Sequence, residues 1–214
     1  RSNPADTVEQ SLHEVPKSQK IHLLKHLLQD NTLYSVLVFT RTKYGADRVA
    51  KQLFRSQIPS GAIHSNRSQN QRARALQDFK DGKTRVLVAT DVAARGIDVE
   101  GITHVINFDF PPHAEDYIHR IGRTGRAKAA GKAISFITSD DHGPLRTLER
   151  LIKRKIALVR PPGFDAKAER PPISDHPKRG QSFNPHGQSR PEGGGGGNRN
   201  RNRRRRSGQR RIGR

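Results

Sequence analysis

The stretch Arg85-Val-Leu-Val-Ala89 is a continuous apolar run that stops abruptly at the polar pair Thr90 and Asp91. Apolar side chains on both faces of a short strand are typical of a parallel sheet that helices cover on both sides. Four further runs share this pattern: Ser35–Phe39, Gly61–His64, His104–Phe108 and Ala133–Ile137. The sequence therefore predicts a core of buried parallel strands.

Helical patterns separate these runs. The sequence predicts helices at about residues 17–30, 43–57, 69–80, 113–122 and 141–157. Strands that alternate with helices indicate an α/β layer fold of the doubly wound type. In such sheets ligands gather at the carboxyl ends of the strands. The polar segments Thr40–Lys43, His64–Arg67 and Thr90–Asp98 all fall at predicted strand ends.

The composition changes near residue 160. Residues 161–214 contain paired prolines, five consecutive glycines at 193–197 and an arginine run at 203–206. They carry 14 Lys and Arg against 4 Asp and Glu. Such a segment cannot bury enough apolar surface to offset its ordering entropy. We therefore expect a folded domain over residues 1–160 and a disordered basic tail over residues 161–214.

The formal net charge of +21 favours a polyanionic partner such as a nucleic acid. A membrane partner is not expected, because no segment approaches the roughly 20 apolar residues of a spanning helix. The chain has no cysteine, so disulfides and thiolate metal sites are excluded. No secretory signal opens the chain, which predicts a cytoplasmic setting. The absence of methionine suggests a piece of a longer protein.

The block His119-Arg-Ile-Gly-Arg-Thr-Gly-Arg126 contains three arginines, held at fixed offsets by two glycines. The planar guanidinium group pairs with phosphate oxygens in bidentate fashion. Such a block suits the phosphates of a nucleoside triphosphate that another domain holds. The alternative is a solvated basic helix end, favoured by the helix dipole. That alternative explains the charge but not the spacing of the glycines.

This block follows Ala89-Thr-Asp-Val-Ala-Ala-Arg-Gly-Ile-Asp98 by about twenty positions. Together they resemble the last motifs of DEAD-box RNA helicases, over roughly residues 5–160. The resemblance implies a RecA-like parallel sheet, the second such domain of an ATP-dependent RNA helicase. The tail and the sequence around Val8–Leu28 are most similar to the RhlE-type branch.

The resemblance also implies roles for residues of the nucleotide site. Arg123 and Arg126 would be arginine fingers on the γ-phosphate, and His119 would couple the site to the partner domain. Gly96 and Asp98 would contact the ribose; taken without the surrounding motif, Asp98 would rather be interpreted as a turn residue. Arg120 is expected to be structural, bracing the loop that carries Asp98.

On the RNA side, the resemblance implies phosphate contacts for Thr42, Arg67 and Thr90. A helix cap is the alternative for both threonines. Gln71 and Arg74 are expected mainly to brace this region. Ser65 is a departure, because the family usually has glycine there, and a site that needed a positive φ would be altered.

Neither a phosphate loop nor an Asp-Glu-Ala-Asp block is present: Gly82-Lys83-Thr84 lacks the earlier glycine, since position 77 is Gln77. The resemblance therefore implies ATP shared with a missing N-terminal RecA-like domain, which would also hold Mg²⁺. The chain alone is expected to be inactive.

RNA is the expected partner, with RNA-processing or ribosome-assembly proteins as further candidates. One alternative is an autonomous RNA-binding or annealing module that acts through the tail. Another is a DNA translocase with related motifs.

Overall fold

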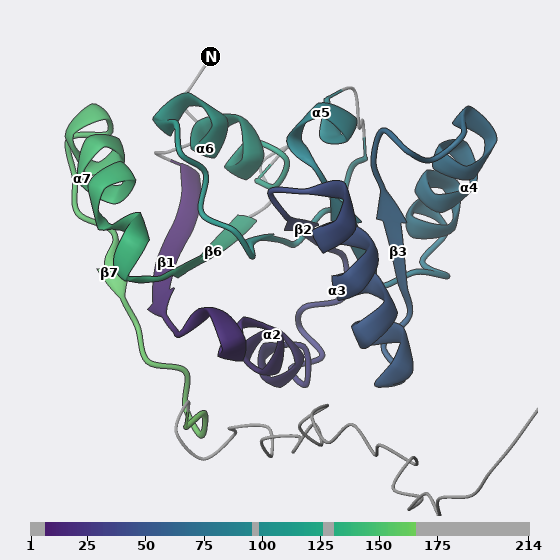
Figure 1. The fold of residues 1–214 in the computed structure, drawn as a ribbon, viewed down its shortest axis with the longest axis horizontal. Helices are drawn as coiled ribbons and strands as arrows, with labels where there is room; N and C mark the ends of the chain where they lie inside the picture. Colours follow the sequence, from purple (N-terminus) through teal and green to yellow (C-terminus); the bar gives the residue numbers. More distant parts are fainter. Residues whose placement is uncertain (1–6, 96–98, 126–130, 166–214) are drawn as a thin grey trace, which may run out of the picture. The chain divides into compact units, whose positions relative to one another are not determined.

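A computed structural model describes residues 7–95, 99–125 and 131–165 (Figure 1). Within these residues the chain forms a seven-stranded sheet in the order β3-β4-β2-β5-β6-β1-β7, and every strand pair is parallel. The strands are β1 (Val8–Glu14), β2 (Val36–Phe39), β3 (Ser60–Ile63), β4 (Val86–Ala89), β5 (His104–Asn107), β6 (Gly131–Ile137) and β7 (Ala157–Leu158). The predicted parallel α/β sheet is confirmed.

Helices cover both faces of the sheet. One face packs against α2 (Lys20–Leu27) and α3 (Lys43–Arg55), which the 3₁₀ turn η1 (Lys17–Gln19) precedes. The other face packs against α4 (Gln69–Lys80), α5 (Asp91–Ala94), α6 (Ala114–Ile121) and α7 (His142–Leu151), with a second 3₁₀ turn η2 (Ser139–Asp141) before α7. Figure 1 shows α5 and α6 together on the side of the sheet away from α2.

The centre of the sheet is buried and mostly apolar because its strands are covered on both sides, with His104 and Asn107 of β5 as buried polar residues. Every residue of β2, β4 and β5 is buried, as the continuous apolar runs predicted. Alternate residues point to opposite faces, so Val36 and Val38 contact the α2–α3 layer while Leu37 and Phe39 contact the other layer. This central core fixes the strand ends from which the polar loops start.

Local capping sets where the helices after β2 and β3 begin. The Thr42 hydroxyl accepts a hydrogen bond from the Gly45 amide at 3.0 Å, so α3 starts directly after the loop that follows β2. Ser68 and Gln71 form a capping box at the start of α4. Both loops are therefore short and held at the carboxyl edge of the sheet.

The sequence patterns missed β1 and β7. The segment Val8–Glu14 is rich in polar residues, yet it lies between β6 and β7, and its Gln10 side chain accepts a hydrogen bond from the Tyr117 hydroxyl at 3.1 Å. The prediction of one helix over residues 141–157 was wrong at its end. The helix stops at Leu151, where Lys153 turns to a φ of 53°, and the chain then pairs with β1.

The domain boundary predicted after residue 160 lies close to the last described residues. The His26 side chain hydrogen-bonds the Pro162 carbonyl at 2.8 Å, and its ring packs 5.5 Å from that of Phe164. Residues 166–214, most of the predicted tail, lie outside the described part of the chain, so the tail stays a prediction. Among the described helices, none has the length and apolar character needed to span a bilayer.

Candidate functional site

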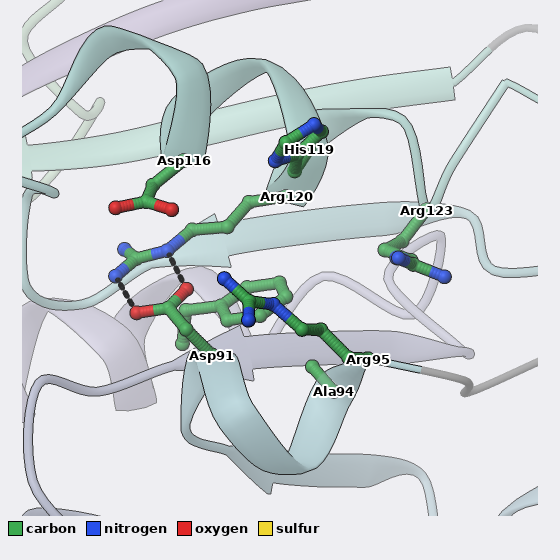
Figure 2. Close-up of a pocket in the computed structure, with 8 residues that line it drawn as sticks. Asp91, Ala94, Arg95, Asp116, His119, Arg120 and Arg123 are labelled. Carbon is green, nitrogen blue, oxygen red and sulfur yellow. Dashed lines mark hydrogen bonds and ion pairs between the residues drawn. The ribbon is translucent and has the colours of Figure 1, made fainter.

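Among the described residues, a partly buried ion pair joins helices α5 and α6. Arg120 of α6 donates to Asp91, the first residue of α5, from Nε at 2.6 Å and from Nη2 at 2.8 Å. The Arg120 side chain is only 3% exposed, while that of Asp91 is 35% exposed. Figure 2 shows the guanidinium fork facing the carboxylate, a geometry that fixes both the distance and the orientation of the two helices.

The remaining donors of Arg120 anchor it to the end of β5. Its Nη1 donates to the Asn107 side-chain oxygen at 3.1 Å and to the Asp109 carbonyl at 2.7 Å. Its guanidinium carbon lies 5.0 Å from the centre of the Phe39 ring. Arg120 is therefore structural, as the sequence suggested, and it holds α5 rather than a ligand. Any contact with residue 98 lies outside the described residues.

Beside this ion pair lies a cavity of about 260 Å³ with a cationic wall. Arg95, His119 and Arg123 all line it, together with Ala94 and Asp116. Figure 2 shows that Arg123 lies apart from the Arg120–Asp91 pair, in the turn that follows α6. Because Arg120 neutralises Asp91 and Asp116 offsets one of Arg95 and Arg123, the lining keeps a net charge of about +1 by residue count, which suits a phosphate group.

The turn that carries Arg123 is tightly packed. The Thr124 hydroxyl donates to the Ile102 carbonyl at 2.5 Å, and Gly125 adopts a φ of 68°. A Cβ atom on Gly131 would collide with the backbone of Gly125 and with the Thr124 hydroxyl. The spacing of Gly122 and Gly125 drew attention to this turn, but the close approach of Gly131 needed the structure.

Three predicted nucleotide-site residues cannot be placed. Gly96 and Asp98 follow α5, and Arg126 follows Gly125, and all three lie outside the described residues. Their described neighbours Arg95 and Gly125 belong to or adjoin the cationic cavity wall. The ribose and second-finger roles therefore stay predictions.

A second polar cluster forms where β3 meets α3. One oxygen of Asp47, Oδ1, receives a bond from Arg67 Nη2 at 2.6 Å and lies 2.9 Å from His64 Nε2. Burial would raise the pKa of Asp47, but the hydrogen bonds from His64 and Arg67 outweigh it and hold that pKa below its usual value. Lys43 adds a second tie to the same loop, 3.0 Å from the Asn66 side-chain oxygen. The carboxylate thus orients Arg67 by charge-assisted hydrogen bonding.

The three residues predicted to contact RNA each lie in a loop that follows the carboxyl end of a strand. Thr42 follows β2, Arg67 follows β3, and Thr90 follows β4. Thr42 is the N-cap of α3, so the helix-cap interpretation applies to it. Thr90 stands at the N-cap of α5 without a side-chain capping bond, which leaves its hydroxyl uncommitted to the helix.

The same region contains Ser65, Gln71 and Arg74, for which the sequence also gave expectations. Ser65 is exposed, and it is not among the described non-glycine residues with positive φ, so serine fits this backbone without strain. Gln71 braces the start of α4 through the capping box. Arg74 is largely exposed and has only a 3.9 Å ion pair with Asp78.

Sequence reasoning missed several residues of these clusters. Asp91 and Asp47, which hold Arg120 and Arg67, gave no signal because their partners are distant in sequence. Arg95 was quoted within its motif but given no role. The Nε atom of Arg72 is buried without a hydrogen-bond partner in the structure, as is that of Arg67. Unpaired buried donors of this kind point to a ligand or water.

Comparison with known proteins gives a consistent family. Residues 19–128 match the model of the helicase conserved C-terminal domain. The chain is 44% identical over 158 residues to the ATP-dependent RNA helicase RhlB of Pseudomonas syringae pv. tomato, covering 74% of this chain. The chain spans 40% of the length of that relative.

Solved structures agree with this assignment. The E. coli DEAD-box protein SrmB, solved bound to the regulator of ribonuclease activity A, is 35% identical with a TM-score of 0.65, over 72% of this chain and 90% of that chain. S. cerevisiae Dbp5, solved bound to RNA and ADP BeF3, is 28% identical with a TM-score of 0.68, over 74% of this chain and 44% of that one. The fold is therefore RecA-like, and the chain belongs to the helicase C-terminal domain family, in its DEAD-box branch.

Proposed function

We propose that this chain is the second RecA-like domain of an ATP-dependent RNA helicase that couples ATP binding and hydrolysis to local unwinding of RNA duplexes. The observation that carries the proposal is the cationic cavity between α5 and α6, which Arg95, His119 and Arg123 line. The Arg120–Asp91 pair fixes its walls. A preorganised cluster of this kind can stabilise charge on transferring phosphates.

On the nucleotide side, Arg123 and Arg126 reach the γ-phosphate of ATP held by a first RecA-like domain. His119, exposed on α6 beside Arg123, couples this surface to that domain. Gly96 and Asp98 contact the ribose, since a carboxylate can accept hydrogen bonds from both hydroxyls. The place of Arg123 in the cavity wall supports its proposed contact with the γ-phosphate. The other roles rest on the resemblance.

On the RNA side, Thr42, Arg67 and Thr90 contact phosphates along one strand. Their loops all leave the carboxyl edge of neighbouring strands in the order β3-β4-β2. Asp47 holds Arg67 Nη2 at 2.6 Å while the Arg67 side chain stays 39% exposed, so the exposed part of the guanidinium can face a phosphate. Contacts to sugar and phosphate explain binding without sequence specificity. That Dbp5 was solved with RNA and ADP BeF3 supports this assignment.

ATP and Mg²⁺ are the cofactors of the proposed reaction. Within the described residues no three His, Cys, Asp or Glu side chains converge on a possible metal position. We assign the Mg²⁺ to acidic residues of the first RecA-like domain, as the resemblance to DEAD-box helicases implies. Closure of the two domains requires both ligands, because each makes contacts that exist only in the closed state.

The substrate and partners of the enzyme are proposed from its family. RNA is its substrate, and RNA-processing or ribosome-assembly proteins are candidate partners, as SrmB was solved with a regulator of ribonuclease activity. A cytoplasmic location and the RhlE-type branch remain predictions.

The test joins this chain to the first RecA-like domain of an RhlB relative. We expect the pair to hydrolyse ATP with stimulation by RNA, and the chain alone to be inactive. The matched control is the same pair carrying Arg123→Gln, which should fold but not respond to RNA. A folded pair that stays inactive would contradict the proposal. Stimulation by DNA in place of RNA would instead indicate a translocase.

A further inference from the structure

A cluster of basic residues outside the proposed cleft lies at the C-terminal end of α7. We call it the α7 basic patch, and it consists of Arg146, Arg150, Lys153, Arg154 and Lys155. All five residues are exposed, and they surround a hollow of about 630 Å³. Five cations around one concavity form a surface that suits an anion larger than a single ion.

The only acidic residue among positions 146–155 does not neutralise this surface. The Glu149 side chain is 9% exposed, and its two oxygens bind Lys155 Nζ at 2.6 Å and the Ile156 amide at 3.1 Å. It therefore serves the turn after the helix. The outward face of the patch keeps a net charge of about +4 by residue count, more than the roughly half charge of a helix C-terminus needs.

The patch lies away from the predicted RNA loops. His142, the first residue of α7, is 3.2 Å from Glu14 at the carboxyl end of β1. From there the helix runs back along the sheet for about 15 Å, at 1.5 Å per residue (Figure 1). The patch is thus on the side of the amino ends of the strands, whereas Thr42, Arg67 and Thr90 stand at the carboxyl ends.

Lys153 occupies a position that normally favours glycine. The Lys153 amide bonds the Arg150 carbonyl at 3.4 Å and the Arg154 amide bonds the Glu149 carbonyl at 3.2 Å, which is the Schellman pattern of helix termination. The φ of Lys153 is 53°, a left-handed conformation that costs free energy for a residue with a side chain. The equivalent residue after α4 is Gly82, with a φ of 72°. Lys153 takes this conformation although glycine would be less strained, and its charged side chain lines the hollow.

We propose that the α7 basic patch is a second RNA contact, which binds the sugar-phosphate backbone of a segment beyond the cleft without need of ATP. Arginine and lysine side chains on an exposed hollow neutralise phosphates without reading sequence. The inference goes beyond the proposed function, on which it rests only for the choice of RNA as the polyanion. The patch holds the substrate while the cleft opens and closes.

The chain offers a matched pair of variants for the test. Lys153→Gly removes one charge and relieves the left-handed strain. Gln57→Gly relieves the same strain after α3, where Gln57 has a φ of 62° and the same two hydrogen bonds, but it removes no charge. Both variants should melt about 2 °C or more above the wild type, because glycine relieves the left-handed strain. A loss of RNA binding by Lys153→Gly could then not be attributed to misfolding.

RNA binding is measured by titration of the full chain with a single-stranded oligoribonucleotide, without ATP and at several salt concentrations. For Lys153→Gly we expect the dissociation constant to rise about fivefold at 0.1 M salt and the salt slope to fall by about 0.7, the value for one lost phosphate contact. Gln57→Gly should match the wild type in both quantities.

A footprint separates the patch from the rest of the chain. In the wild type, RNA should protect Lys153 and Lys155 from an amine-reactive reagent and leave the exposed Lys51 of α3 reactive. Unchanged reactivity of Lys153, or an unchanged salt slope for Lys153→Gly, would overturn the inference and leave an acidic protein surface as the candidate occupant. Neither measurement involves ATP or a first domain, so this failure is distinct from failure of the reconstituted ATPase.

Discussion

Arg120 donates two hydrogen bonds to the Asp91 carboxylate, at 2.6 and 2.8 Å, from a side chain that is 3% exposed. Three residues further along, Arg123 lines the open cavity beside this pair. One short motif therefore contains an arginine that is buried against Asp91 and an arginine that lines the cavity, for which we propose a ligand role. Substitution of each arginine separates these roles.

Replacing Arg120 should destabilise the fold. The variant Arg120→Leu leaves the Asp91 carboxylate, the Asn107 oxygen and the Asp109 carbonyl without their shared donor. Removing one partner of a buried pair costs about 3–5 kcal/mol. We expect the lower end of that range because the Asp91 side chain is 35% exposed. Denaturant unfolding measures the change, and an unfolding free energy equal to that of the wild type would refute the anchoring role.

Replacing Arg123 should reduce ATP hydrolysis much more than it reduces stability. We expect Arg123→Gln to lower the unfolding free energy by less than Arg120→Leu does, because the half-buried Arg123 side chain is less buried than that of Arg120. In the pair with a first RecA-like domain, RNA-stimulated ATP hydrolysis should fall by about a thousandfold or more, the usual value of an arginine finger. The measurement is a steady-state ATPase assay; a loss of less than tenfold in a folded pair would speak against the finger role.

Replacing Asp47 tests whether its contact with Arg67 matters for RNA binding, because net charge and side-chain positioning predict opposite changes in RNA affinity. Asp47→Asn makes the chain more positive, so simple electrostatics predicts tighter RNA binding. Because Asp47 orients Arg67 at 2.6 Å, we expect weaker binding instead, by up to about fivefold at 0.1 M salt, the value for one phosphate contact.

The double variant Asp47→Asn/Arg67→Gln should bind RNA no more weakly than Arg67→Gln alone, since both changes remove one contact. As a charge control, Arg74→Gln removes a cation whose side chain is 87% exposed and should have a smaller effect. Tighter binding by Asp47→Asn would show that Asp47 does not position Arg67.

Gly131 is predicted to be irreplaceable at the turn that carries Arg123. In Gly131→Ala the new Cβ would meet the Gly125 backbone and the Thr124 hydroxyl, which also donates to the Ile102 carbonyl. Overpacking of this kind costs about 1–3 kcal/mol. The control is Gly143→Ala on α7, where nothing lies within 4 Å and stability should hold or improve. Equal melting temperatures for the two variants would contradict the close packing.

Stability should fall as the pH is lowered from 7.5 to 5.5. Burial lowers the pKa of His13 and of His104, with Lys132 adding to the effect at His104. The unfolded chain titrates near the ordinary value of about 6.5, so in this window it binds more protons than the folded chain. Protonation therefore favours unfolding. Thermal melts across this range measure the slope, which His104→Asn should flatten; a wild-type melting temperature that rises toward pH 5.5 would contradict the prediction.

The sequence by itself determined the parallel core and its order of elements. Runs such as Val86–Ala89 are apolar on both faces, and that property is local, so it can be read without knowing the partners. The same holds for the cap at Thr42, whose hydrogen bond spans only three residues. The sequence patterns did not predict the polar strand β1, because it is stabilised as a strand by its pairing with β6, more than a hundred residues away.

Only the tertiary structure decided which polar residues act together. Asp91 meets Arg120 across 29 positions and Asp47 meets Arg67 across 20, and neither pairing has a signal in the local pattern. The left-handed turn at Lys153 and the contact of Gly131 with Gly125 are likewise set by where the chain must go next. Local sequence fixes which segments form helices and strands, but charges find their partners only when those segments pack.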